Sequence, residues 1–235
     1  MSIGCLAAEP AAPAAPPAPV VASSAPNNPG KMSFFVTSTA PGGGDLGGID
    51  GADAHCAALA RAVGSPASRH WRAYLSLAPI GSQKQVDARD RIGKGPWFNA
   101  KGEEIAASVD ELHSANPKMS KATNLTEKGE INPGRGDTPN VHDALTGSNA
   151  EGRLAPPQVN APRANEPPTP LPSNMTCNNW TSNDPALVTM QGHIDRNGFV
   201  PAASSWNAAH PSRGCSVPGI ASTGSKGQFY CFATD

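Results

Sequence analysis

Histidines are the residues of this sequence best suited to metal binding or to acid–base chemistry. Two histidine–aspartate pairs could suggest a metal site, His142-Asp143 and His193-Ile194-Asp195. Imidazole and carboxylate groups are ligand types that transition metals accept in proteins. Neither pair has a third ligand at a spacing typical of a zinc motif. The sequence therefore predicts histidines at the surface or at helix caps, with no metal and no other cofactor.

Motifs of the common enzyme classes are missing from the sequence. It contains no Gly-x-Ser-x-Gly nucleophile elbow and no His-Glu-x-x-His helix. The glycine run at 42–44 lacks the lysine of a nucleotide-binding loop. The formal net charge of −1 provides no basic surplus for neutralising phosphates, which disfavours nucleic-acid binding. We therefore expect a protein that is neither an enzyme nor a partner of nucleic acid.

Recognition of a protein or a glycan requires exposed side chains of mixed chemistry, and two irregular stretches, 116–176 and 191–213, offer them. The candidate ligand-binding residues in these stretches are Arg135, Asp137, Asn149, Glu151, Arg153 and Trp206. Arg135 and Asp137 belong to an Arg-Gly-Asp triplet, which displays a cation and a carboxylate across a flexible glycine. In the alternative interpretation Trp206 is buried and the other residues only solvate a loop.

Short elements must position these loops. The aromatic and β-branched run 33–38 predicts a strand, 71–77 predicts a second strand, and 228–232 predicts a closing strand that pairs with the first. Apolar residues at helical spacing predict a helix over 51–63, capped by Asp50, with Cys56 on its apolar face. A short helix is predicted over 103–114. Regular patterns vanish from 116 to 176.

Five cysteines are present, and four of them lie in the globular part of the chain. These four permit three pairings, and no Cys-x-x-Cys motif indicates a zinc ribbon or a thioredoxin-type site. Disulfides stabilise small exported domains, typically by about 2–4 kcal/mol each.

Seven short segments, spread in order over residues 32–235, form a further pattern. They are FVTS (35–38), DLGG (45–48), GADAHC (51–56), WRAYLS (71–76), LTGSNAEG (145–152), CNNWTS (177–182) and YCF (230–232). Together they resemble the bacterial endostatin-like surface proteins, a family with a C-type-lectin-like fold that was long carried as a domain of unknown function.

The resemblance implies an α+β, C-type-lectin-like domain in which a short N-terminal helix packs on a small antiparallel sheet beside a long irregular loop region. It also implies two disulfides, Cys56–Cys231 and Cys177–Cys215. Calcium-dependent sugar binding, as in C-type lectins, is not expected. At the comparable positions stand Pro168 and Ala208, and neither supplies a side-chain oxygen for calcium.

The N-terminal segment differs in composition from the rest. Residues 1–31 are predicted to be a truncated lipoprotein-like N-terminus followed by a Pro/Ala-rich spacer, and residues 32–235 the domain. Prolines prevent helix and central strand in the spacer, which favours an extended conformation. Cys5 follows a small residue and precedes the spacer, so it is the predicted lipid attachment site and the only expected link to a membrane.

These patterns predict a non-enzymatic binding module, exported to the periplasm or to the outer membrane and surface of a bacterium and lipid-anchored there. Its expected ligand is a protein or a glycan, bound through the loop region. The alternative is a structural or accessory subunit of an envelope or extracellular assembly, held by its extended N-terminal tail.

Overall fold

Short strands and helices, joined by long irregular segments, make up the computed structural model, which describes residues 23–159 and 171–235. Cys5, the predicted lipid site, lies outside the described residues. The strands are β1 (Phe34–Val36), β2 (Trp71–Ala73), β3 (Trp97–Phe98), β4 (Glu104–Ala106), β5 (Asp143–Leu145), β6 (Met190–His193), β7 (His210–Pro211) and β8 (Tyr230–Ala233). The helices are α1 (Gly48–Ala62), α2 (Val109–Leu112), α3 (Cys177–Trp180) and α4 (Val217–Ala221), with 3₁₀ turns η1 (Ala88–Asp90) and η2 (Pro201–Ser204).

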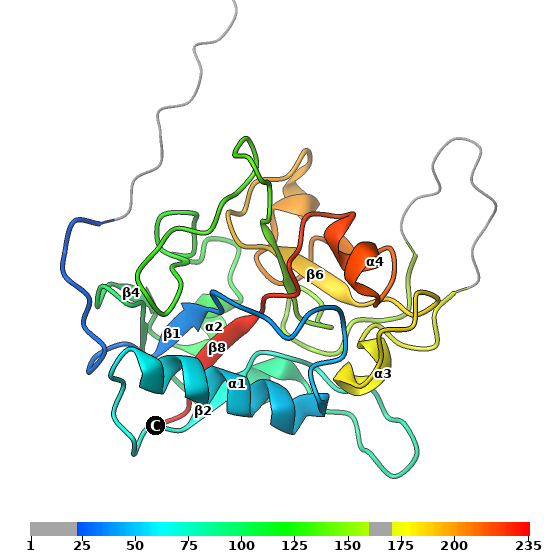
Figure 1. The fold of residues 1–235 in the computed structure, drawn as a ribbon, viewed down its shortest axis with the longest axis horizontal. Coiled ribbons are helices and arrows are strands. Elements are labelled where there is room, and N and C mark those ends of the chain that lie inside the picture. The colour runs from blue at the N-terminus through cyan, green and yellow to red at the C-terminus, as the bar shows by residue number, and fades with distance from the viewer. Residues whose placement is uncertain (1–22, 160–170) are drawn as a thin grey trace, which may run out of the picture.

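The central sheet joins the two ends of the domain. β8 lies between β1 and β2 and runs antiparallel to both, with Phe35 and Ala73 each opposite Cys231 (Figure 1). The predicted pairing of the first and last strands is therefore confirmed. The fold mixes helices with three small sheets in the described part of the chain, and their strand pairings are antiparallel.

Each face of the central sheet packs into its own core, because successive side chains of a strand point to opposite faces. Phe35 and Cys231 point toward α1, which runs along one side of the molecule (Figure 1). Phe34 and Phe232 point the other way, into an aromatic cluster that includes Trp206. The sheet is thus buried on both faces.

Both predicted disulfides are confirmed. Cys56 of α1 is joined to Cys231 of β8, and Cys177 of α3 is joined to Cys215 in the loop before α4. The first bridge ties the long helix to the central strand. The second closes a late loop, and Gly44 is required beside it because a Cβ there would lie 2.3 Å from the Cys177 Sγ.

The helix predictions need two corrections. α1 begins at Gly48 rather than 51, because Gly47 adopts a left-handed conformation that starts the helix earlier and leaves Asp50 inside its first turn. The helix predicted over 103–114 is wrong for its first half. There β4 pairs with β3, and helix α2 begins only after Ser108, whose side chain accepts from the Glu111 amide.

The three strand predictions were too long, and further strands were not predicted: the strand predicted over 33–38 is β1, Phe34–Val36, and the closing strand predicted from 228 begins at Tyr230. β2 ends at Ala73, four residues before the predicted end at 77. The irregular stretch 116–176 does contain one strand, β5, which pairs with β6, and β6 in turn pairs with β7. This second three-stranded sheet, β5-β6-β7, positions the candidate site.

No helix in the described ranges has the length and apolarity to cross a membrane.

Candidate metal centre

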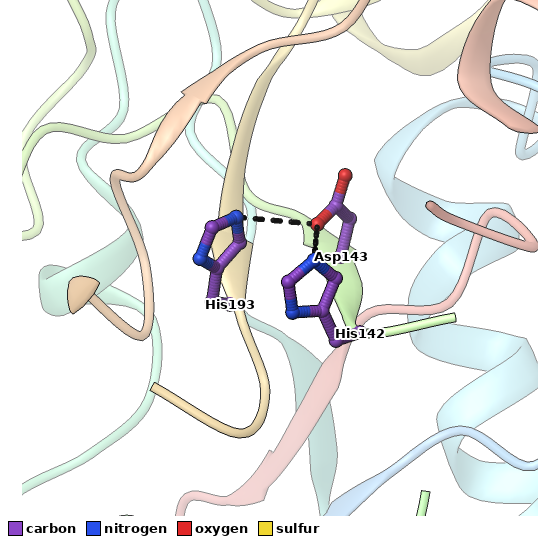
Figure 2. A group of neighbouring side chains, drawn as sticks. All are labelled: His142, Asp143 and His193. Carbon is purple, nitrogen blue, oxygen red and sulfur yellow. Dashed lines mark ion pairs between the residues drawn. The ribbon is translucent and has the colours of Figure 1, made fainter. Parts of the chain in front are cut away.

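Three histidines and an aspartate converge on the β5-β6-β7 sheet. Asp143 on β5 lies directly opposite His193 on β6, so their side chains leave the same face of the sheet. His142 immediately precedes β5, and His210 is the first residue of β7. Figure 2 shows the rings of His142 and His193 both directed at the Asp143 carboxylate. Residues far apart in the sequence thus form one cluster.

The spacing of the polar atoms is unusual for hydrogen bonds. The Asp143 Oδ1 lies 3.4 Å from His142 Nε2 and 3.4 Å from His193 Nε2, and its Oδ2 lies 3.5 Å from His210 Nε2. An N–H···O bond prefers about 2.7–3.2 Å between heavy atoms. Ligands held about 2.0–2.2 Å from a tetrahedral zinc ion lie about 3.3–3.5 Å apart. The two separations from Oδ1 match the second geometry, and the ligand atoms of His142, Asp143 and His193 all lie within 4.8 Å of one another, whereas His210 faces the other oxygen, Oδ2.

The outer nitrogens of two histidines set the tautomers. His142 Nδ1 lies 3.0 Å from Asp195 Oδ1, and His210 Nδ1 lies 3.0 Å from the backbone oxygen of Pro211. Carboxylates and carbonyls only accept, so we assign the proton to Nδ1 in both rings. In the neutral rings the Nε2 lone pairs then face the Asp143 carboxylate. Such a pocket of electron pairs requires a cation or added protons.

Burial makes this arrangement costly without a cation. The Asp143 side chain is fully buried, and His142 and His193 are only 6% and 5% exposed. Neither Asp143 oxygen and neither ring nitrogen of His193 has a hydrogen-bond partner of ordinary geometry. An unsatisfied buried polar group costs about 1–3 kcal/mol, and more when it is charged. His210, with a side chain 28% exposed, forms the solvent side of the cluster.

The pKa shifts follow from the same surroundings. Burial raises the pKa of Asp143 to about 6, against the opposing effect of His210 and His142. Burial, followed by the charges of His142 and His210, lowers the pKa of His193 to about 4. Burial also disfavours the charged form of His142, but the hydrogen bond to Asp195 and the neighbouring carboxylates together hold its pKa above the ordinary value.

The donor set selects a class of metal. Three imidazole nitrogens and one carboxylate suit Zn²⁺ and neighbouring first-row ions. Ca²⁺ and Mg²⁺ prefer six or more oxygen ligands, which this cluster does not offer. Asp195, behind His142, is the carboxylate partner that metal-binding histidines commonly have, and it orients the ring.

The expectation of surface or capping histidines is wrong for His142 and His193, which are buried in the cluster. The sequence did contain the two His–Asp pairs that contribute most of it. It gave no sign of their meeting, because the pairing of β5 with β6 and of β6 with β7 has no motif of its own.

Trp206 is buried, 3% exposed, so its interpretation as a core residue is confirmed. Its indole N–H donates to the Leu112 backbone oxygen, and its ring packs on Tyr74 and Tyr230. Trp206 therefore offers no exposed aromatic face for ligand binding, contrary to its place among the candidate ligand-binding residues. The residues next to Trp206 in the sequence give no signal of its burial, because the aromatic cluster around it is assembled from distant strands.

The other candidate ligand-binding residues lie on two turns. Asn149, Glu151 and Arg153 share one, where the Asn149 side chain accepts from the Arg153 amide and the Arg153 guanidinium pairs with Asp87. The second turn carries Arg135 and Asp137 of the Arg-Gly-Asp triplet, where Arg135 stacks over the Phe199 ring and Asp137 pairs with Lys121. A binding role for these five residues stays a prediction.

The fold and the cluster define a class of protein, a disulfide-stabilised domain of helices and small antiparallel sheets with a buried His–Asp centre. No family model matches the chain, and no curated protein matches it. The disulfides indicate an oxidising compartment, either extracellular or periplasmic.

Proposed function

We propose that this chain is an exported module that binds a divalent transition-metal ion, Zn²⁺ by its geometry, through His142, Asp143, His193 and His210. The observation that carries the proposal is the convergence of His142 Nε2 and His193 Nε2, each 3.4 Å from the Asp143 Oδ1, in a buried cluster where neither Asp143 oxygen and neither His193 ring nitrogen has an ordinary hydrogen bond; His210 Nε2 lies 3.5 Å from the Oδ2. A cation at the centre satisfies the facing electron pairs that the cluster otherwise leaves opposed.

In the proposed site His142, Asp143 and His193 supply three ligand atoms within 4.8 Å of one another, and His210, on the Oδ2 side of the carboxylate, supplies the fourth; four protein ligands favour a structural role for the ion. Structural zinc sites use four protein ligands, whereas catalytic sites keep one position for water or substrate. An ion held by β5, β6 and β7 crosslinks three strands that are only two to four residues long. Strands this short gain little from their own hydrogen bonds, so a metal crosslink stabilises the sheet and the loops attached to it. This supports a non-enzymatic function.

The wider setting of the module is proposed from the sequence. The C-type-lectin-like fold follows from the resemblance to the bacterial endostatin-like surface proteins. A lipid on Cys5 and the Pro/Ala-rich spacer of residues 1–31 hold the domain at the outer membrane or the cell surface. The two disulfides support this export.

A second candidate function is the recognition of a protein or glycan ligand, and one surface feature favours it. Phe199 is 89% exposed, and the Arg135 guanidinium lies 3.4 Å from the centre of its ring. An exposed aromatic ring stacked with a cation offers both apolar area and hydrogen-bond donors, as binding surfaces do. In the alternative role, the same protein is an accessory subunit of an envelope assembly.

Metal binding is tested on the full chain with its disulfides intact. The protein is stripped with a chelator, loaded with Zn²⁺ or Co²⁺, desalted and analysed for bound metal. We expect one ion per chain and, with Co²⁺, the intense visible absorption of a tetrahedral site. Retention of no metal above the level of a chelated blank contradicts the proposal.

The matched variants are His193→Ala and His70→Ala. His193 lies in the cluster, whereas His70 is an exposed histidine between α1 and β2. We expect His193→Ala to lose the bound metal and the cobalt spectrum, and His70→Ala to keep both. Circular dichroism and non-reducing mass analysis show whether each variant is folded and oxidised. Equal metal retention by the two variants would place the ion elsewhere.

A further inference from the structure

Asp195 connects the metal centre to two outer turns. Its Oδ1 lies 3.0 Å from His142 Nδ1 and accepts from the Asn197 amide at 3.0 Å. Its Oδ2 accepts from the Arg135 amide at 2.7 Å. The Asp195 carboxylate, whose side chain is only 3% exposed, therefore links His142 to both turns. We call these two turns, residues 133–137 and 195–200, the crest.

The approach of the two turns is close. A Cβ at Gly134 would lie 2.5 Å from Asp195 Oδ2, so only glycine allows this contact. On the outer side, Arg135 stacks over Phe199. Phe199 is 89% and Val200 is 56% exposed. The crest thus carries the largest exposed aromatic surface among the described residues, directly beyond the metal centre.

Each turn of the crest also has contacts of its own. The Gly134 amide donates to the Asp137 carboxylate at 2.7 Å, and the Arg196 amide donates to the His193 backbone oxygen at 3.0 Å. The Arg196 guanidinium donates to the backbone oxygens of Pro117 and Ser204, and Asp137 pairs with Lys121 at 2.5 Å. Asp137 is 41% exposed at its side chain, so this ion pair contributes little to stability. What Asp195 adds is the link from both turns to His142, so the position of the crest relative to the cluster depends on this carboxylate.

We propose that occupancy of the metal centre controls the order of the crest, so that the Arg135–Phe199 surface is held in place in the metal-loaded protein and loosened in the metal-free one. The inference rests on the proposed metal binding and adds the regulation of a surface to it. The metal fixes the His142 ring through Nε2. The Nδ1–H of that ring then holds Asp195, which holds the amides of Arg135 and Asn197.

Linkage gives the size of the effect. Removing the outer partner of a metal-binding histidine typically lowers metal affinity about 10–100-fold. Coupling between two sites is reciprocal, so the metal strengthens the Asp195 contact by the same factor. We therefore expect zinc to slow the opening of the crest amides about 10-fold or more.

Hydrogen exchange, followed by mass spectrometry on the full oxidised chain, tests the coupling with Zn²⁺ and with chelator. Peptides that cover 133–140 and 195–200 are expected to exchange about 10-fold more slowly with zinc. The internal control is the amide of Leu154, which donates to the Asp87 carboxylate at 2.9 Å, a bond of the same kind outside the cluster. Its exchange is expected to stay unchanged.

Two matched variants sharpen the test. Asp195→Asn is expected to lower zinc affinity about 10–100-fold and, at saturating zinc, to leave the crest exchanging as fast as in the metal-free protein. Asp87→Asn removes a comparable carboxylate and is expected to change neither property.

Each outcome decides a different point. Zinc that binds without slowing the crest, or that slows all peptides equally, overturns the coupling and leaves the proposed metal site standing. Zinc that does not bind overturns both. A slowed crest in the Asp195→Asn variant at saturating zinc also overturns the coupling, because the signal then bypasses Asp195.

Discussion

Replacing Asp143 by asparagine should change the stability of the protein in opposite directions with and without metal. Asparagine keeps the shape of the side chain but carries no charge. In the metal-free protein, its amide N–H groups donate to the Nε2 lone pairs that face this position. In the metal-loaded protein, the substitution removes the only anionic ligand of the cluster.

The size of the metal-free effect follows from the pKa of Asp143. Burial raises that pKa from 3.8 to about 6. One pKa unit corresponds to about 1.4 kcal/mol, so at pH 8 the ionised carboxylate destabilises the folded, metal-free protein by about 3 kcal/mol. A raised carboxyl pKa means that the folded state holds its proton longer than the unfolded state. This penalty therefore grows as the pH rises from about 4 to about 6 and is complete above that.

The size of the metal effect follows from mass action. Free zinc at 100 times its dissociation constant stabilises the folded wild-type protein by about 2.7 kcal/mol. Asp143→Asn should lose most of this gain. We therefore expect the variant to have a higher free energy of unfolding than the wild type in chelator, and a lower gain on adding zinc.

Urea denaturation at pH 8, in chelator and in excess zinc, measures both quantities. The disulfides stay oxidised in every sample, with each protein measured both in chelator and in zinc. His70→Ala serves as the control that should respond to zinc as the wild type does. A variant that is less stable than the wild type in chelator, and equally stabilised by zinc, would refute the reasoning about the cluster.

Three further expectations concern the rest of the fold. Asp53→Ala removes the carboxylate that lies 2.7 Å from the largely buried Arg91 guanidinium and leaves that charge only its hydrogen bond to the Ala73 backbone oxygen, which should cost about 3 kcal/mol in urea denaturation; a loss below about 0.5 kcal/mol contradicts this. Burial lowers the pKa of His113, so its protonation opposes folding, and the contribution of His113 to stability should fall as the pH drops below about 6.5. His113→Gln should flatten that acid-side loss in chelator, and an unchanged pH profile speaks against it. Replacing Cys56 and Cys231 together by alanine opens a bridge with a sequence separation of 175 and should cost about 5 kcal/mol by chain entropy, measured by thermal unfolding against the wild type.

Local patterns were sufficient to predict α1 and the three strands of the central sheet. The apolar face of the first helix, the aromatic strand near 34 and the closing strand near 231 were each predictable, because each is encoded in a few neighbouring residues. Their pairing was expected because one strand begins the domain and the other ends it, and the structure confirms it. The disulfide pairing was implied by the family resemblance, and the structure confirms it.

Local patterns failed where two structures compete for the same residues. The stretch 103–114 has helical spacing, but β4 gains a partner strand in β3, and the chain turns to helix only after the Ser108 cap. Tertiary pairing thus overrode local propensity. Trp206 is similar, because its burial depends on Tyr74 and Tyr230, which distant strands bring to it.

The candidate metal centre was decided by the tertiary structure alone. The sequence determined that His142 and Asp143 are adjacent, and that His193 lies two residues before Asp195. It did not determine that these pairs meet, since that depends on the register between β5 and β6, and a shift of one residue would turn His193 to the other face. His210 joins through a second pairing. Ligands within one helix or hairpin leave a spacing in the sequence, whereas ligands from three paired strands leave none.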